Sequence, residues 1–406
     1  MRRTIILLFT IIFSLACEKK VDLLVHNAKV YTSDDNYNDI TSFVVDEGKF
    51  IEVGGEELIE KYKSVSVVNA RGLPVFPGFI DSHCHLLSLG LKQFEVDLKG
   101  TKSFEEIVFK LKDYSLNKNL SVLRGAGWDQ NDWDNKDLPS KDSLDIVFPN
   151  IPVVLSRIDG HAMLVNQKAL DMAGISLKTK ANGGEIVTSN GKLTGLIIDK
   201  PMELIEEIIP RYTESEKIKA LKTAEKICFE NGITTVDEAG LLKSDILLID
   251  SLQKNNLFDL RVYAMVANEK KSLEYFFKNG SIKNDRLNVS SIKVYADGAL
   301  GSRGAALKDS YSDKNNHYGS IIISIDSIEK LAIKALAHDF QMNTHAIGDY
   351  ANSEVLKIYN DILSDKSDPR WRIEHAQVIS NEDFSKFNEK IIPSVQPLHA
   401  TSDMYW

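Results

Sequence analysis

Apolar and polar residues alternate along residues 21–32 and again along residues 42–54, where Gly48 interrupts the alternation. This pattern is typical of half-buried β-strands, and a glycine between two such runs is typical of a turn. We therefore expect a small β domain over residues 22–75.

Beyond this region, short apolar segments alternate with longer amphipathic ones. Residues 213–232 and 324–340 have the spacing of amphipathic helices, each with Ser or Thr near its start. Strand and helix in alternation predict parallel βα units and an α/β fold. The clearest strand segments are 151–161, 232–240, 290–299, 340–349, 371–379 and 391–400.

Polar residues gather at the C-terminal end of each predicted strand. They are His83 and His85, Asp159 and His161, Asp237 and Glu238, Lys293, His345, His375 and His399. In a parallel barrel these strand ends share one face, where active sites form. An open, doubly wound sheet would spread them along a crevice instead. Seven strands that each deliver a polar residue favour the barrel.

His83 and His85 stand two residues apart on a predicted strand. Side chains at this spacing point to the same face, so both imidazoles project inward, whereas Cys84 points away and is expected to pack. Two converging imidazoles suit a divalent metal, and His345 and His375 can complete the ligand set. Three other histidines are expected to be structural: His26, His317 and His338.

Lys293 lies in an apolar strand whose end faces the same predicted site. Burial and a nearby cation would both lower the pKa of its amine. A neutral amine can react with carbon dioxide to give a carbamate, whose two oxygens can bridge two metals. The alternative is a lysine that forms a salt bridge with a carboxylate such as Asp297.

The N-terminus resembles a secretory signal, with Arg2 and Arg3 before an apolar run that is too short to span a bilayer. Residues 14–17, Ser-Leu-Ala-Cys, resemble a bacterial lipobox, so we expect a signal peptide over residues 1–17 with lipidation at Cys17. Ordinary cleavage is the alternative. The expected location is the bacterial cell envelope, attached to the membrane through that lipid.

The 406 residues carry a formal net charge of −9 and show no basic stripe interleaved with aromatics. Nucleic-acid binding needs clustered Lys and Arg, so no nucleic-acid partner is expected. Only Cys84 and Cys228 remain if Cys17 is lipidated, too few for a disulfide framework.

Seven segments together resemble the amidohydrolase superfamily, in particular the branch (amidohydrolase family 3) that includes N-substituted formamide deformylase. The segments are 77–85, 127–133, 156–170, 292–307, 343–352, 372–377 and 394–406. The resemblance implies a metal-dependent hydrolase β/α (TIM-like) barrel over residues 76–406, and it implies that residues 22–75 are part of a small β-sandwich.

The resemblance also implies one or two divalent metal ions, usually zinc, with iron or manganese as other options. It assigns the metal ligands to His83 and His85, to Lys293, which is carboxylated in many superfamily members, and to His345 and His375. The implied reaction is hydrolysis of a non-peptide carbon–nitrogen bond (amide, N-acyl or N-formyl) in a small molecule by metal-activated water.

In the superfamily a catalytic aspartate ends strand eight of the barrel. The sequence stops at Trp406, directly after the strand-seven motif. We therefore expect the aspartate to lie beyond the chain end, name no catalytic residue among the 406, and interpret the chain as a fragment of the active enzyme.

The candidates for substrate binding are His161, Arg303 and Trp128. In this interpretation His161 and Arg303 hold a carbonyl or carboxylate group, and Trp128 forms an aromatic wall of the site together with Trp133. The alternative is that both tryptophans pack the segment between the first strands. Two other functions stay open, because fold does not fix function. They are a membrane-tethered metal-binding protein without turnover, and an ester, lactone or phosphotriester hydrolase. The sequence does not give the oligomeric state.

Overall fold

The computed structural model describes residues 19–33, 40–118, 120–158, 160, 162–180, 184–301 and 303–402. The chain divides into two compact units, Met1–Phe79 and Ile80–Trp406. Within the described part of the chain, none of the helices has the length and apolar character needed to cross a membrane.

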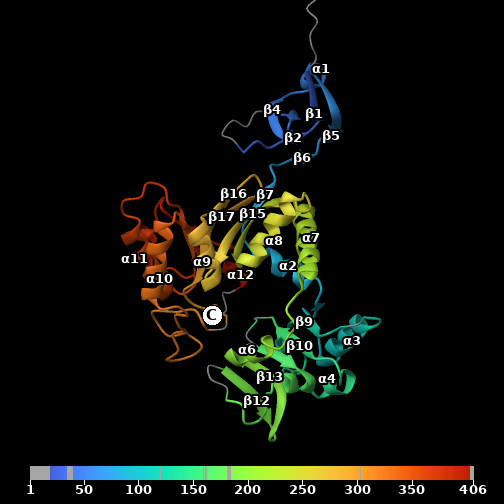
Figure 1. The fold of residues 1–406 in the computed structure, drawn as a ribbon, viewed down its shortest axis with the longest axis vertical. Coiled ribbons are helices and arrows are strands. Elements are labelled where there is room, and N and C mark those ends of the chain that lie inside the picture. The colour runs from blue at the N-terminus through green and yellow to red at the C-terminus, as the bar shows by residue number, and fades with distance from the viewer. Residues whose placement is uncertain are drawn as a thin grey trace, which may run out of the picture. The chain divides into compact units, whose positions relative to one another are not determined.

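The first unit is built on a four-stranded sheet with the order β4-β3-β1-β5 (Figure 1). Glu47 and Gly48 both have positive φ, 50° and 71°, and make the turn between β3 and β4 that the alternation around Gly48 predicts. The elements of this unit are β1 (Lys19–His26), β2 (Lys29–Val30), β3 (Ser42–Asp46), β4 (Lys49–Gly54), α1 (Leu58–Lys61), β5 (Tyr62–Asn69) and β6 (Pro74–Val75), of which β2 and β6 pair in parallel.

A curled, largely parallel sheet forms the centre of the second unit. It has eight strands, seven of which follow in the order β20-β19-β18-β17-β15-β14-β7, while β16 pairs antiparallel with β17. Apart from β16, spatial order equals sequence order, as in a βα barrel. The strands are β7 (Phe79–Cys84), β14 (Ile233–Leu241), β15 (Arg261–Ala267), β16 (Ile282–Lys283), β17 (Leu287–Tyr295), β18 (Gln341–Ala346), β19 (Trp371–His375) and β20 (Ile391–Ser394).

Helices line the outer side of this sheet (Figure 1). The predicted helix over 213–232 is confirmed as α7, which begins with a reciprocal capping box between Thr213 and Glu216. The helix predicted over 324–340 is confirmed as α10, with Ser324 as its N-cap. The helical elements are α2 (Leu86–Lys92), α7 (Glu214–Glu230), α8 (Lys243–Lys254), α9 (Lys270–Asn279), α10 (Ile325–Ala337), α11 (Asp349–Ile362), η3 (Asn381–Lys386) and α12 (His399–Ser402).

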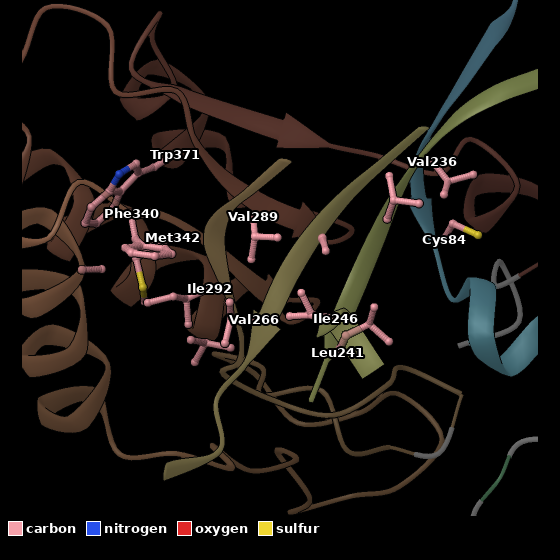
Figure 2. Packing of buried hydrophobic residues seen from close by; sticks show 14 of the residues in the cluster. Cys84, Val236, Leu241, Ile246, Val266, Val289, Ile292, Phe340, Met342 and Trp371 are labelled. Carbon is pink, nitrogen blue, oxygen red and sulfur yellow. The ribbon is translucent and has the colours of Figure 1, made fainter. Parts of the chain in front are cut away.

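The hydrophobic core lies between the strands and these helices. Figure 2 shows Val236, Val266, Ile292 and Met342, which come from four neighbouring strands and are all buried. Because side chains alternate along a strand, the residues next to them in sequence point to the inside of the curl. The interior face therefore carries the polar residues, and the outer face carries the core.

The segment between α2 and α7 forms a second sheet, and one strand predicted for the barrel belongs to it. The strand predicted at 151–161 is not a barrel strand, because β10 pairs with β9 and β11 in a separate six-stranded sheet of order β12-β13-β11-β10-β9-β8. The sequence prediction also omitted β15, which lies between β14 and β17 in the curled sheet. Hydrophobic pattern identifies a buried strand but not the sheet that takes it.

The inserted sheet packs on its own cores, formed by its strands and short helices. Its elements are β8 (Val96–Asp97), α3 (Phe104–Ser115), β9 (Leu123–Trp128), η1 (Gln130–Asp132), α4 (Asp142–Val147), β10 (Val153–Arg157), β11 (Ala162–Val165), α5 (Gln167–Met172), β12 (Gly184–Ser189), β13 (Lys192–Asp199), η2 (Lys200–Met202) and α6 (Glu203–Glu206).

Candidate metal centre

Four histidines lie ring against ring inside the C-terminal end of the curled sheet. His83 is the penultimate residue of β7, and His85 directly follows that strand. His345 lies in β18, and His375 is the last residue of β19. Ring centroids are 5.4 Å apart for His83 and His85, and 4.6 Å apart both for His83 with His375 and for His345 with His375. The structure thus brings together all four predicted histidines from three strands.

The backbone turns sharply where His375 enters this histidine cluster (His83, His85, His345 and His375). His375 and Ala376 have φ values of 73° and 41°, in the left-handed region that non-glycine residues rarely occupy. Such strain persists where surrounding structure enforces it, and it is common at functional sites. The His375 Nδ1 also shares a hydrogen bond of 2.6 Å with Gln396 Oε1, from the segment after β20.

Burial keeps three of the clustered imidazoles neutral, those of His85, His345 and His375. It lowers the pKa of His345 to about 4 and that of His375 to about 2, with further contributions from neighbouring histidines and Lys293. Packing lowers the pKa of His85 to about 4 in the same way. A neutral imidazole keeps a lone pair on one ring nitrogen, which is the form that binds metals.

Lys293 projects from β17 into this interior and is 1% exposed. Its Nζ has no hydrogen-bond partner among the described residues, and burial lowers its pKa to about 8. The Nζ lies 5.0 Å from the centroid of the Tyr295 ring, which in turn lies 5.3 Å from the His345 ring. Lys293 therefore belongs to the same site as the histidines.

Asp297, the alternative partner for Lys293, is occupied elsewhere. Its carboxylate accepts hydrogen bonds from the backbone N–H groups of Ala306, Ile347 and Gly348, at 2.9, 3.0 and 2.8 Å. It thus ties the loop after β17 to the start of α11. No salt bridge between Lys293 and Asp297 occurs in the described part of the chain, so this alternative is not supported.

Two charged residues of β19 complete the site, and the sequence analysis missed both. Glu374 is fully buried, and its Oε2 lies 2.5 Å from His83 Nδ1. Arg372, also buried, donates from Nε to Glu374 Oε1 at 2.7 Å. The available signal was a pair of charges at alternate positions in an apolar strand, which places both on the inner face.

The chemistry of this donor set fits a divalent cation, although its geometry is not that of a finished site. Among the described residues, no three His, Cys, Asp or Glu side chains converge closely enough to hold a metal ion. Four adjacent imidazoles and a buried amine without a hydrogen-bond partner are nevertheless groups that suit a divalent metal and a carbamate ligand.

Two of the predicted substrate residues, Trp128 and Arg303, have their contacts away from the histidine cluster. Trp128 is 0% exposed, donates its indole N–H to the Leu155 carbonyl at 2.9 Å and stacks near Trp133 in the inserted core, as the packing alternative expects. Both tryptophans pack, because the segment that carries them folds into a separate sheet. Arg303 forms an ion pair with Asp313. His161 and Cys17 lie outside the described residues.

A cavity of about 820 Å³ borders α2, the helix that follows His85. Its walls come from α2, β8 to β10 and the segment around Tyr212, and they carry both signs of charge, including Lys92, Glu95 and Lys99. A space of this size can hold a small molecule.

The amidohydrolase family model matches residues 66–406, which include the curled sheet, the histidine cluster and Lys293. The chain belongs to the amidohydrolase family. It is 32% identical to the protein LONG AFTER FAR-RED 3 of Arabidopsis thaliana, covering 94% of this chain and 69% of that protein. It is also 32% identical to the putative amidohydrolase YtcJ of Bacillus subtilis, covering 94% and 74%.

A solved structure supports the same fold for this amidohydrolase. An uncharacterized metal-dependent hydrolase from Pyrococcus horikoshii superposes with a TM-score of 0.79 at 26% identity, covering 94% of this chain and 76% of that one. N-substituted formamide deformylase of Arthrobacter pascens, the branch that the sequence analysis named, is 24% identical over 87% of this chain. The superfamily prediction is confirmed, whereas the deformylase branch is a more distant relative.

Replacing Lys293 by methionine should stabilise the metal-free protein. A buried amine without a partner carries an uncompensated desolvation cost, and methionine has a similar length without the charge. We expect the free energy of unfolding to rise by about 1–3 kcal/mol, measured by urea denaturation in buffer free of metal and carbon dioxide. The matched control is Lys330→Met on the exposed face of α10, expected to change little. A loss of stability in Lys293→Met alone would show that the amine has a partner in solution.

Proposed function

We propose that this amidohydrolase is a metal-dependent hydrolase of non-peptide carbon–nitrogen bonds in small amide-type molecules. The observation that carries the proposal is the meeting of four imidazoles and one buried lysine without a hydrogen-bond partner at the C-terminal ends of parallel strands. That face of a barrel is where active sites form.

His83, His85, His345 and His375 would hold one or two divalent ions, with zinc as the expected metal. A bound metal of this kind lowers the pKa of water and polarises a substrate carbonyl. Lys293 would contribute as a carbamate, since its lowered pKa of about 8 leaves part of the amine neutral near physiological pH. The carbamate forms when the Nζ lone pair attacks carbon dioxide and a proton leaves the nitrogen.

The surrounding residues would orient these ligands. Glu374 holds His83 at Nδ1, and Gln396 holds His375 at Nδ1, which leaves each Nε2 for the metal. The substrate class is supported by the family and by the distant likeness to a deformylase.

The residue that returns a proton to the leaving nitrogen stays a prediction. The family resemblance places it as an aspartate at the end of an eighth barrel strand. In the described part of the chain, β7 and β20 end the run of paired strands, and relatives in the family are longer than this chain. The active enzyme in this proposal includes that strand, and the small sheet of the first unit forms one half of a β-sandwich.

The proposal also places the protein at the bacterial cell envelope, through lipidation at Cys17. Ser-Leu-Ala-Cys at residues 14–17 supports this. In a bacterial host, the wild-type chain should take up radiolabelled palmitate and fractionate with membranes, whereas Cys17→Ser should take up none. Labelling of Cys17→Ser equal to that of the wild type would rule out this anchor, and Cys84→Ser serves as the control.

Removing one imidazole should remove the metal. We expect His345→Ala to lower zinc affinity by at least about tenfold, because the other donors cannot close the ligand set. Zinc content after dialysis and a chelator competition measure this. His338→Ala is the control, since the His338 ring contacts the Lys334 carbonyl and Phe277 and none of the clustered histidines in the contacts described, and it should keep wild-type affinity. Equal zinc retention in both variants would contradict the proposed ligands.

Substrate preference should follow the bond class. The zinc-loaded protein is tested with and without a C-terminal extension that contains strand eight. It should hydrolyse N-acyl and N-formyl amides faster than matched esters, lactones or phosphotriesters. Turnover should appear with the extension and disappear on treatment with chelator. Preference for esters would support the ester hydrolase instead. Metal binding with no turnover in either form would support a binding protein. Turnover by the metal-free protein would contradict a metal-dependent hydrolase of either kind.

A further inference from the structure

One buried guanidinium contacts both ends of the curled sheet. Arg372 Nη2 donates to the Ser82 carbonyl in β7 and, at 2.9 Å, to Ser394 Oγ in β20. Its Nη1 donates to Asp237 Oδ2 in β14 at 2.5 Å. Since β7 and β20 end the run of seven strands, the sheet curls far enough for its two ends to meet around one side chain.

The same guanidinium fixes the carboxylate that contacts His83. Arg372 Nε and Nη2 bind the two oxygens of Glu374 at 2.7 and 3.1 Å, a bidentate pair inside the sheet. Both oxygens of Glu374 therefore face the guanidinium, and the two side chains form a buried salt bridge in which the carboxylate carries the negative charge.

The charge of Glu374 decides which nitrogen of His83 carries the proton. An ionised carboxylate only accepts hydrogen bonds. The 2.5 Å contact therefore requires that His83 Nδ1 be protonated and donate to Glu374 Oε2. The His83 Nε2 is then the nitrogen that remains for a ligand inside the histidine cluster.

We infer that Glu374 and Arg372 are positioning residues that set the tautomer and ring orientation of His83. Glu374 contacts the His83 ring directly. Arg372 fixes the position of Glu374, because the same guanidinium is hydrogen-bonded to β7, β14 and β20. The inference rests on the proposed metal site for its consequence, namely higher metal affinity. The tautomer itself does not depend on any metal.

The first readout is the tautomer in the metal-free protein. Histidine side chains labelled with ¹⁵N are observed by NMR at mildly alkaline pH, and the signals of His83 are assigned by their loss in His83→Gln. The wild type should show a protonated Nδ1, with a strongly deshielded proton, and a bare Nε2. Glu374→Gln should lose this signature, whereas Glu382→Gln, an equal change at an exposed carboxylate, should keep it.

The second readout is zinc affinity, measured by chelator competition on the same proteins. Loss of a group that orients a metal-binding histidine typically costs 10–100-fold in affinity, and we expect a loss of this size in Glu374→Gln and none in Glu382→Gln. Arg372→Lys keeps the charge but loses the two-pronged donor geometry, so it should show mixed tautomers and an intermediate affinity.

Each outcome decides the inference. An unchanged His83 signature in Glu374→Gln, or a wild-type His83 protonated at Nε2 only, would overturn it, and so would equal zinc affinity in Glu374→Gln and the wild type. A wild-type protein with the expected tautomer but no zinc binding would refute the proposed metal site and leave the tautomer assignment standing. If Glu374→Gln does not fold, Arg372→Met with Glu374→Gln removes both charges at similar volume and is tested the same way.

Discussion

The site depends on a buried ion pair inside a curled parallel sheet. Arg372 and Glu374 lie on the inner face of β19, and their charges are held by each other and by groups from β7, β14 and β20. A buried charge is tolerated only when it is paired and hydrogen-bonded. The curl supplies those partners, and the pair in turn links the strands that carry the histidines.

The interior polar residues make sense as one set of linked groups. Arg372 holds Glu374, Glu374 contacts His83, and His83 packs against His85 and His375. Lys293 stands among them without a hydrogen-bond partner in the described structure. A fold gains no stability from such an amine, so its presence indicates function. Outer-face residues such as Ile292 and Met342 meanwhile build an ordinary core.

Much of this arrangement could be predicted from sequence because it follows from short-range rules. Strand alternation placed His83, Lys293 and His345 on one face, and capping residues marked the helices that start after Thr213 and Ser324. The sheet that takes a strand is a long-range choice, so β10 was placed in the barrel although it pairs with β9 and β11. For the same reason the sequence left open whether Trp128 packs or lines a pocket, and the fold places it in the inserted core.

The supporting residues were missed because their role depends on contacts distant in sequence. Glu374 and His83 are 291 residues apart, and nothing near Glu374 in the sequence points to β7. Gln396 likewise meets His375 only after β20 has joined the sheet. Local pattern can show that a charge is buried in a strand, whereas its partner follows only from the tertiary fold.

X-ray absorption at the zinc edge of the zinc-loaded protein tests the central claim most directly, because it reports the atoms bound to the metal. The account predicts nitrogen and oxygen neighbours at about 2.0–2.1 Å with the multiple scattering of imidazole. Sulfur neighbours at about 2.3 Å, which would implicate Cys84 or Cys228, or a protein that retains no zinc, would contradict a metal centre built on the histidine cluster.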